Sequence, residues 1–149
     1  MPPLRVLAAG LLTALLLACS PGNTPKPPVG ALLPQDPNGN FVLYVSNQSF
    51  AISPVDITIS IDGTKAIQDD FDVKNQHHYV QYQFHLAPGK HILKADSSKG
   101  GAALAQEFEV KDKHWAAIEY WYYPAVTGGA GPTPKSFVFV VKDTPIGFD

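Results

Sequence analysis

The side chains best suited to binding a ligand lie in one stretch, residues 115–123, which contains five aromatic residues and one glutamate. In a β-strand, successive side chains point to opposite faces, so every second residue of this stretch shares a face. One face would carry Ala116, Ile118, Tyr120 and Tyr122, and we expect it to line the core. The other would carry two indoles, a carboxylate and a phenol, from Trp115, Glu119, Trp121 and Tyr123.

Two interpretations of this second face stay open. Aromatic rings stack on the C–H groups of sugars, and a carboxylate accepts hydrogen bonds from hydroxyls, so an exposed face would be a carbohydrate-binding platform. A face covered by the loop at residues 124–135, or lying in a central strand, would instead belong to the core. Large aromatic side chains are usually buried, which favours the structural interpretation.

The histidines are the next candidates, because imidazole binds zinc and copper well. Adjacent residues such as His77 and His78 point in opposite directions on a strand, and the remaining histidines do not share a face either. We therefore expect no metal site and no cofactor. For His91, which follows a turn glycine on an inward face, we expect a ring nitrogen to bond a nearby backbone carbonyl. The five are His77, His78, His85, His91 and His114.

Motifs for catalysis are missing from the sequence. It has no Gly-x-Ser-x-Gly elbow, no His-Glu-x-x-His pair and no phosphate-binding glycine loop that opens a helix. We expect no catalytic residue and a protein that is not an enzyme; a small hydrolase or metal-dependent enzyme would require a pocket of histidine and carboxylate side chains. The formal net charge of −2 and the lack of a basic run argue against nucleic acid as a partner.

The N-terminus has the three-part plan of a secretion signal: Arg5, an apolar stretch at residues 6–17, and Ala18 directly before Cys19. A membrane-spanning helix needs about 20 apolar residues, which is more than this stretch supplies. The run Leu16-Leu17-Ala18-Cys19 resembles the lipobox of bacterial lipoproteins. The resemblance implies a diacylglyceryl group on the Cys19 thiol and cleavage just before it. The alternative is an ordinary signal peptide with a stray cysteine.

The same resemblance implies a cell-envelope protein held on its membrane by an N-terminal lipid. Ser20, in place of an aspartate, favours the outer membrane if the organism is Gram-negative. Residues 19–39 are expected to form an extended tether, because proline fixes φ and lacks an amide donor. The expected division is a signal peptide at 1–18, the lipidated cysteine and tether at 19–39, and one folded domain at 40–149. The tether prolines are Pro21, Pro25, Pro27, Pro28, Pro34 and Pro37.

The elements that must position this aromatic face are β-strands, because apolar residues recur at every second position along much of the chain. Residues 55–61 alternate apolar and polar, and residues 80–86 do the same before a Pro88-Gly89 turn and a partner strand at 90–96. Further strands are expected at 41–46, 65–73, 103–110, 115–122 and 136–142. Seven or eight short strands without an amphipathic helix predict an all-β fold, a single antiparallel two-sheet β-sandwich.

Three short runs resemble the Ig-like and prealbumin-like sandwiches of bacterial envelope proteins: Val55-Asp56-Ile57, Ile61-Asp62-Gly63 and Leu86-Ala87-Pro88-Gly89-Lys90-His91. The resemblance covers residues 55–95 and implies a fold without catalytic residues. Our leading hypothesis is a non-enzymatic binding or structural module whose partner is an envelope protein or a glycan. The alternative is a carbohydrate-binding lipoprotein that uses the exposed aromatic strand.

Overall fold

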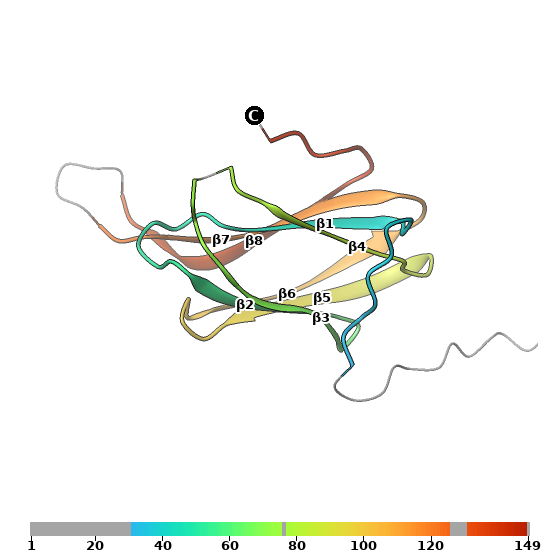
Figure 1. Ribbon diagram of the computed structural model, residues 1–149, viewed down its shortest axis with the longest axis horizontal. Coiled ribbons are helices and arrows are strands. Elements are labelled where there is room, and N and C mark those ends of the chain that lie inside the picture. Colours follow the sequence, from blue (N-terminus) through green and yellow to red (C-terminus); the bar gives the residue numbers. More distant parts are fainter. Residues whose placement is uncertain (1–30, 76, 126–130, 149) are drawn as a thin grey trace, which may run out of the picture.

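The computed structural model describes residues 31–75, 77–125 and 131–148. The predicted signal peptide, the lipidation site Cys19 and most of the predicted tether lie outside these residues. The described part of the chain is all β, with eight strands and no helix, and so contains no helix that could cross a membrane. The strands form two four-stranded sheets that lie one over the other (Figure 1).

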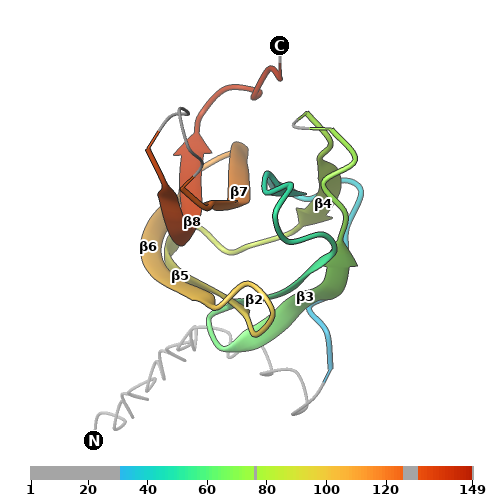
Figure 2. The ribbon, with the colours of Figure 1, turned by 90° about the vertical axis from the view of Figure 1, so that its left-hand side faces the viewer.

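Sheet A has the strand order β4-β1-β7-β8, and sheet B has the order β3-β2-β5-β6. Each strand predicted from the alternation is present, with ends that differ by a few residues. Figure 2 shows β8 beside β6 on one side of the molecule and β4 above β3 on the other. The bounds are β1 Phe41–Asn47, β2 Val55–Ile61, β3 Thr64–Phe71, β4 Val80–Phe84, β5 Gly89–Ser97, β6 Ala102–Val110, β7 His114–Tyr123 and β8 Thr133–Lys142.

The prediction of a purely antiparallel fold was wrong. Sheet B is antiparallel throughout, but β1 runs parallel to β7, with Phe41 aligned to His114 and Asn47 aligned to Tyr120. Sheet A is therefore mixed. Turn sequences report the direction of strands that follow each other in a hairpin, whereas β1 and β7 meet only when the whole domain closes.

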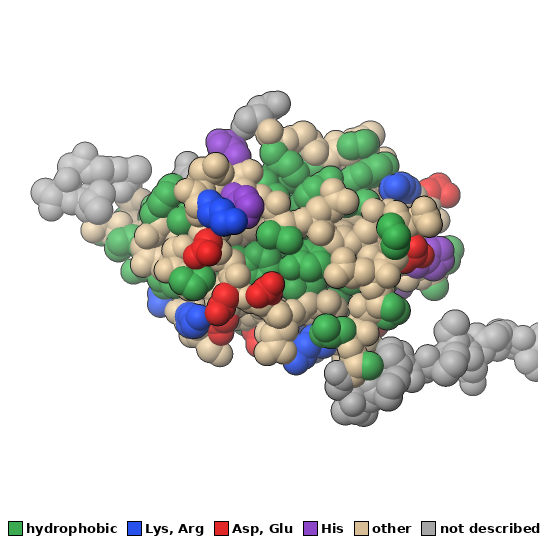
Figure 3. Space-filling view, in the orientation of Figure 1, with side chains coloured by type: hydrophobic (Ala, Val, Ile, Leu, Met, Phe, Trp, Pro, Cys, Tyr) green, Lys and Arg blue, Asp and Glu red, His purple; other side chains and the backbone are tan. Residues whose placement is uncertain are grey.

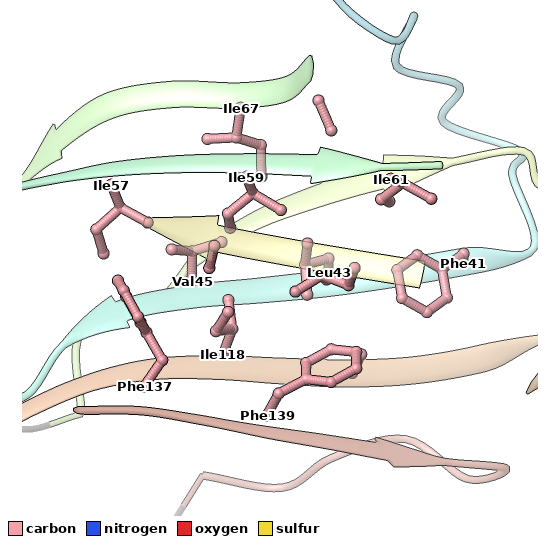
Figure 4. Packing of buried hydrophobic residues seen from close by; sticks show 14 of the residues in the cluster. Phe41, Leu43, Val45, Ile57, Ile59, Ile61, Ile67, Ile118, Phe137 and Phe139 are labelled. Carbon is pink, nitrogen blue, oxygen red and sulfur yellow. The ribbon is translucent and has the colours of Figure 1, made fainter. Parts of the chain in front are cut away.

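The core lies between the inner faces of the two sheets. Ile57, Ile59 and Ile61 of β2 point toward Leu43 and Val45 of β1, and all five side chains are at most 2% exposed (Figure 4). The inward residues alternate with outward polar ones, as a half-buried strand requires. The inward face of β7 also joins this core, as the sequence predicts.

Tyr120, the largest fully buried side chain, reaches across the core to the turn between β5 and β6. Its hydroxyl donates a hydrogen bond to the carbonyl of Gly100 at 2.9 Å. A Cβ atom at Gly100 would lie 2.7 Å from the Tyr120 ring, so only glycine fits under this ring. This contact joins the central strand of sheet A to a turn of sheet B.

His91 joins two turns at the other end of sheet B. Its Nε2 lies 2.7 Å from the carbonyl oxygen of Ala87, which confirms the predicted carbonyl contact, and its Nδ1 lies 2.6 Å from a carboxylate oxygen of Asp62. Asp62 and Gly63 have positive φ angles of 51° and 78°, as a tight Asp-Gly hairpin turn requires. The ring therefore ties the Asp62-Gly63 turn to the turn that precedes β5.

The described end of the predicted tether is part of the fold. The amide of Leu33 donates to the Lys65 carbonyl on β3, and the amide of Asp36 donates to the Gln83 carbonyl on β4. The Leu33 side chain packs against the core. This stretch therefore bridges the edge strands of the two sheets, ahead of residue 40 where we expected the domain to begin.

Candidate functional site

The outward face of β7 carries the four residues singled out in the sequence. Trp115, Glu119, Trp121 and Tyr123 all lie on this face and are half-buried, so the face is neither a bare platform nor part of the core. Ala117, which also points outward, is only 3% exposed, which shows that other parts of the chain cover the middle of the strand.

Glu119 is held by two aromatic donors. Its Oε1 accepts a hydrogen bond of 2.6 Å from the Tyr79 hydroxyl, and its Oε2 accepts one of 2.9 Å from the Trp121 indole nitrogen. Burial, followed by the hydrogen bond and negative charge of Glu119, raises the pKa of Tyr79 well above its usual value. Tyr79 therefore remains a neutral donor, and the carboxylate keeps a fixed orientation on the sheet.

Trp121 lies next to this carboxylate, and Tyr123 lies next to Trp121. Their ring centroids are 6.1 Å apart with an interplanar angle of 50°, and the Tyr123 hydroxyl donates a 2.6 Å hydrogen bond to the carbonyl of Gln48. Trp115 is separate. It is four strand residues from Glu119, or about 13 Å, and Lys113 places its ammonium 5.7 Å from the Trp115 ring centroid. The structure thus brings three of the four candidate residues together.

A hollow of about 330 Å³ lies on this face over β7 and β8, and we call it the outer groove. Ala117, Val138 and Val140 form its apolar floor, and Tyr79, Glu119, Lys142 and Phe148 surround it. Val138 and Val140 are 45% and 43% exposed, which is unusual for valines on a packed sheet. A hollow of this size with an apolar floor and a few polar groups is typical of a binding site.

One wall of the outer groove is the C-terminal segment, residues 144–148, which turns back over sheet A (Figures 1 and 2). The Phe148 ring stacks on Tyr79 with centroids 3.7 Å apart and meets Tyr44 edge-on at 4.9 Å. In Figure 3, hydrophobic side chains gather where this segment crosses sheet A, and acidic and basic ones are frequent over the edge of sheet B.

Sequence reasoning missed three aromatic residues of this site: Tyr44, Tyr79 and Phe148. Tyr44 lies on the outward face of β1, but the other two belong to connecting or terminal segments where alternation gives no signal. The sequence cue was an aromatic residue a few positions after the last predicted strand. Such a residue is typical of a segment that packs against something, but its target cannot be identified locally.

No group of three or more histidine, cysteine, aspartate or glutamate side chains within the described residues is arranged to hold a metal ion. His77 borders the outer groove, and His91 is bonded on both ring nitrogens. His114 is buried, with its Nε2 3.4 Å from Asp143. A second hollow, of about 570 Å³, is lined mainly by charged side chains around the β6–β7 turn, which is typical of a solvated surface.

The arrangement can bind a ligand through aromatic rings, valine methyls and the remaining lone pairs of Glu119. Among the residues placed by the structure around this groove, none is a nucleophile hydrogen-bonded to a base. No protein-family model matches the chain, and comparisons with curated proteins and with solved structures give no significant match. Its function must therefore be inferred from its own residues.

Proposed function

We propose that this protein is a lipid-anchored, non-enzymatic binding module of the cell envelope whose binding surface is the outer face of sheet A. The observation that carries the proposal is the outer groove. It combines an apolar floor, aromatic walls and an oriented carboxylate on a sheet that is rigidly packed beneath it. Sites on rigid strands hold their geometry better than sites on loops.

The anchoring half of the proposal is supported by the sequence alone. The apolar stretch ending in Leu16-Leu17-Ala18-Cys19 resembles a lipoprotein signal, and Cys19 is the only cysteine. Two or three acyl chains hold a protein firmly on a bilayer, whereas one holds it marginally. A module anchored in this way would act on envelope partners, and Ser20 favours the outer membrane of a Gram-negative cell.

Of the two sandwich families that the sequence resembles, we propose the prealbumin-like one. In an immunoglobulin constant domain the first, second, fifth and fourth strands share a sheet. Here β1 and β2 belong to different sheets, and β1 pairs with β4 and β7. This strand order argues against the Ig-like alternative.

A glycan is the second candidate ligand, and one observation favours it. Trp121 and Tyr123 are neighbouring, half-buried rings, and Trp121 bonds the Glu119 carboxylate, whose remaining lone pairs can accept from hydroxyls. This is a suitable surface for the face of a sugar ring. This cluster is smaller than the platform expected from sequence, because Trp115 lies apart from it.

Cross-linking in cells tests the binding surface. A photo-activatable amino acid at Val138 should form discrete adducts with a protein or glycan. The same amino acid at Ile92 is a matched control, because Ile92 is equally exposed, at 46% against 45%, but lies on sheet B. Adducts at Val138 that match those at Ile92 in kind and yield would contradict the proposed surface.

Metabolic labelling with a fatty-acid analogue tests the anchor. Wild-type protein should carry the label, and Cys19→Ala should lack it and accumulate as an uncleaved precursor, since the thiol is the only acceptor in the predicted signal. Equal labelling of both proteins would reject lipidation at Cys19.

A further inference from the structure

The C-terminal segment, which forms one wall of the outer groove, already covers part of this face of sheet A. Phe148 inserts its ring between Tyr79 and Tyr44, stacking on the first at 3.7 Å and meeting the second edge-on. Ile146 and Gly147 line the same hollow. This face of the sheet is therefore complementary to an extended peptide that presents an aromatic side chain.

The segment is held weakly for a part of a folded domain. Among the described residues, no hydrogen bond links residues 144–148 to the sheet. Its attachment rests on the ring of Phe148 and on van der Waals contact. About 330 Å³ of the groove stays open beside it, and the floor valines remain more than two-fifths exposed.

The chemistry of the floor favours a peptide over a sugar inside the groove. A sugar would place hydroxyls against the methyl groups of Val138 and Val140, where they would lose hydrogen bonds to water without replacement. The apolar side chains of a peptide lose nothing there. Glu119 and Lys142 mark opposite ends of the groove, about 13 Å apart by strand spacing, which is the length of roughly four extended residues.

We propose that the outer groove is a peptide-binding site for a partner protein, and that the C-terminal segment is the intramolecular stand-in for that peptide. The partner supplies an extended stretch with an aromatic side chain that takes the place of Phe148 on Tyr79. A basic group toward Glu119 and an acidic group toward Lys142 complete the match. The inference rests on the proposed binding surface and names its class of ligand.

The test uses the full chain and a fluorescent synthetic peptide with the sequence of residues 143–149 as the probe. In the wild-type protein the attached segment competes at an effective concentration in the millimolar range, so the probe should bind poorly. In Phe148→Ala the ring position against Tyr79 and Tyr44 is vacated, and the probe should bind about tenfold tighter or more by fluorescence anisotropy, since apparent affinity scales with the open fraction.

Three controls make the test specific. Phe50→Ala removes an equally large ring that is 59% exposed, and should behave as the wild type. A probe with alanine in place of its phenylalanine should not bind Phe148→Ala. Adding Val138→Asp, at an exposed floor position where a charge does not disturb the core, should abolish binding while far-ultraviolet circular dichroism remains unchanged.

Equal affinity of the probe for wild type and Phe148→Ala would overturn the inference. Equal affinity of Phe148→Ala for the probe and for its alanine-substituted version would overturn it as well. A panel of defined oligosaccharides that binds Phe148→Ala when the probe does not would also overturn it, yet leave the proposed binding surface standing. A concentration-dependent dimer in sedimentation experiments that disappears in Phe148→Ala would identify a second copy of this chain as the occupant, against a separate partner.

Discussion

The outer faces of the two sheets differ although the strands beneath them follow the same alternation. On sheet B many of the outward side chains are charged, and some of them pair along the surface, as in Lys90 with Glu107 at 2.7 Å, where the two side chains are 73% and 57% exposed. On sheet A the outward carboxylate of Glu119 is enclosed by Tyr79 and Trp121. The outer face of sheet B is exposed to solvent, whereas the outer face of sheet A is partly covered by segments from elsewhere in the chain.

The difference teaches that an alternating strand predicts which side chains leave the core, but not what they meet outside it. Exposed ion pairs contribute little to stability, because water screens them and their long side chains lose freedom. A carboxylate with two donors in a partly dehydrated site contributes more, since removing it leaves the donors without an acceptor. Substitutions on the two faces should therefore have unequal effects.

The largest loss of stability is expected from substitutions in the core, where the inner faces of both sheets are apolar. Ile59→Asp would bury an unpaired charge at a position that is 0% exposed and should unfold the domain, with a cost of about 4 kcal/mol or more. Ile92→Asp is the matched control on sheet B, where the side chain is 46% exposed, and should leave the melting temperature nearly unchanged. A folded Ile59→Asp protein in circular dichroism would contradict the assigned core.

The next effect compares a carboxylate from each outer face. Glu119→Ala should cost about 2 kcal/mol in urea denaturation, because the Tyr79 hydroxyl and the Trp121 indole both lose their acceptor. Glu107→Ala removes an equally sized group from the exposed pair on sheet B and should change the midpoint little. Similar midpoints for the two variants would mean that the enclosed carboxylate has no special role.

A smaller, pH-dependent effect is expected from Asp56 on sheet B. Partial burial raises the pKa of its carboxyl, but hydrogen bonds from the Ser97 hydroxyl and the amides of Lys99 and Ser98 outweigh burial and lower it overall. Because the folded-state pKa is lowered, this stabilisation is complete above about pH 4 and is lost as the pH falls through the folded-state pKa.

Asp56→Asn should therefore lower the free energy of unfolding by about 1 kcal/mol or less at pH 7, given the solvent exposure of the site. The difference in stability between the variant and the wild type should become smaller in acid. Thermal melts from pH 7 to pH 2.5 measure the gap. Asp112→Asn, in the exposed β6–β7 turn, is the control and should track the wild type. A gap that stays constant across this range would argue against a lowered pKa.

The smallest effect is expected from the ion pair on sheet B. Lys90→Ala should leave the melting temperature within experimental error at physiological salt, although the hydrogen bond and charge of Glu107 raise the pKa of the Lys90 ammonium. If Lys90→Ala instead clearly lowered the melting temperature, and high salt abolished the difference from wild type, the ion pairs on sheet B would contribute more to stability than we expect.

Much of the fold could be predicted from the sequence because the signals are local. Alternation of apolar and polar residues marks β2 and β4 most clearly, and Asp62-Gly63 marks a hairpin turn through its positive φ angles. The inward position of His91 and its contact with the Ala87 carbonyl also follow from residues close in the chain. The assignment of Cys19 as a lipidation site, outside the described residues, stays a prediction from the sequence.

The tertiary structure alone decided which distant segments meet. The parallel pairing of β1 with β7, the packing of Leu33 against the core, and the placing of Tyr79 and Phe148 over sheet A each join residues far apart in the chain. Strand periodicity says that a face points outward, but whether it meets water or another segment depends on the closure of the whole domain. That closure, through Tyr79 and Phe148, turned the aromatic side of β7 from an open platform into a partly filled groove.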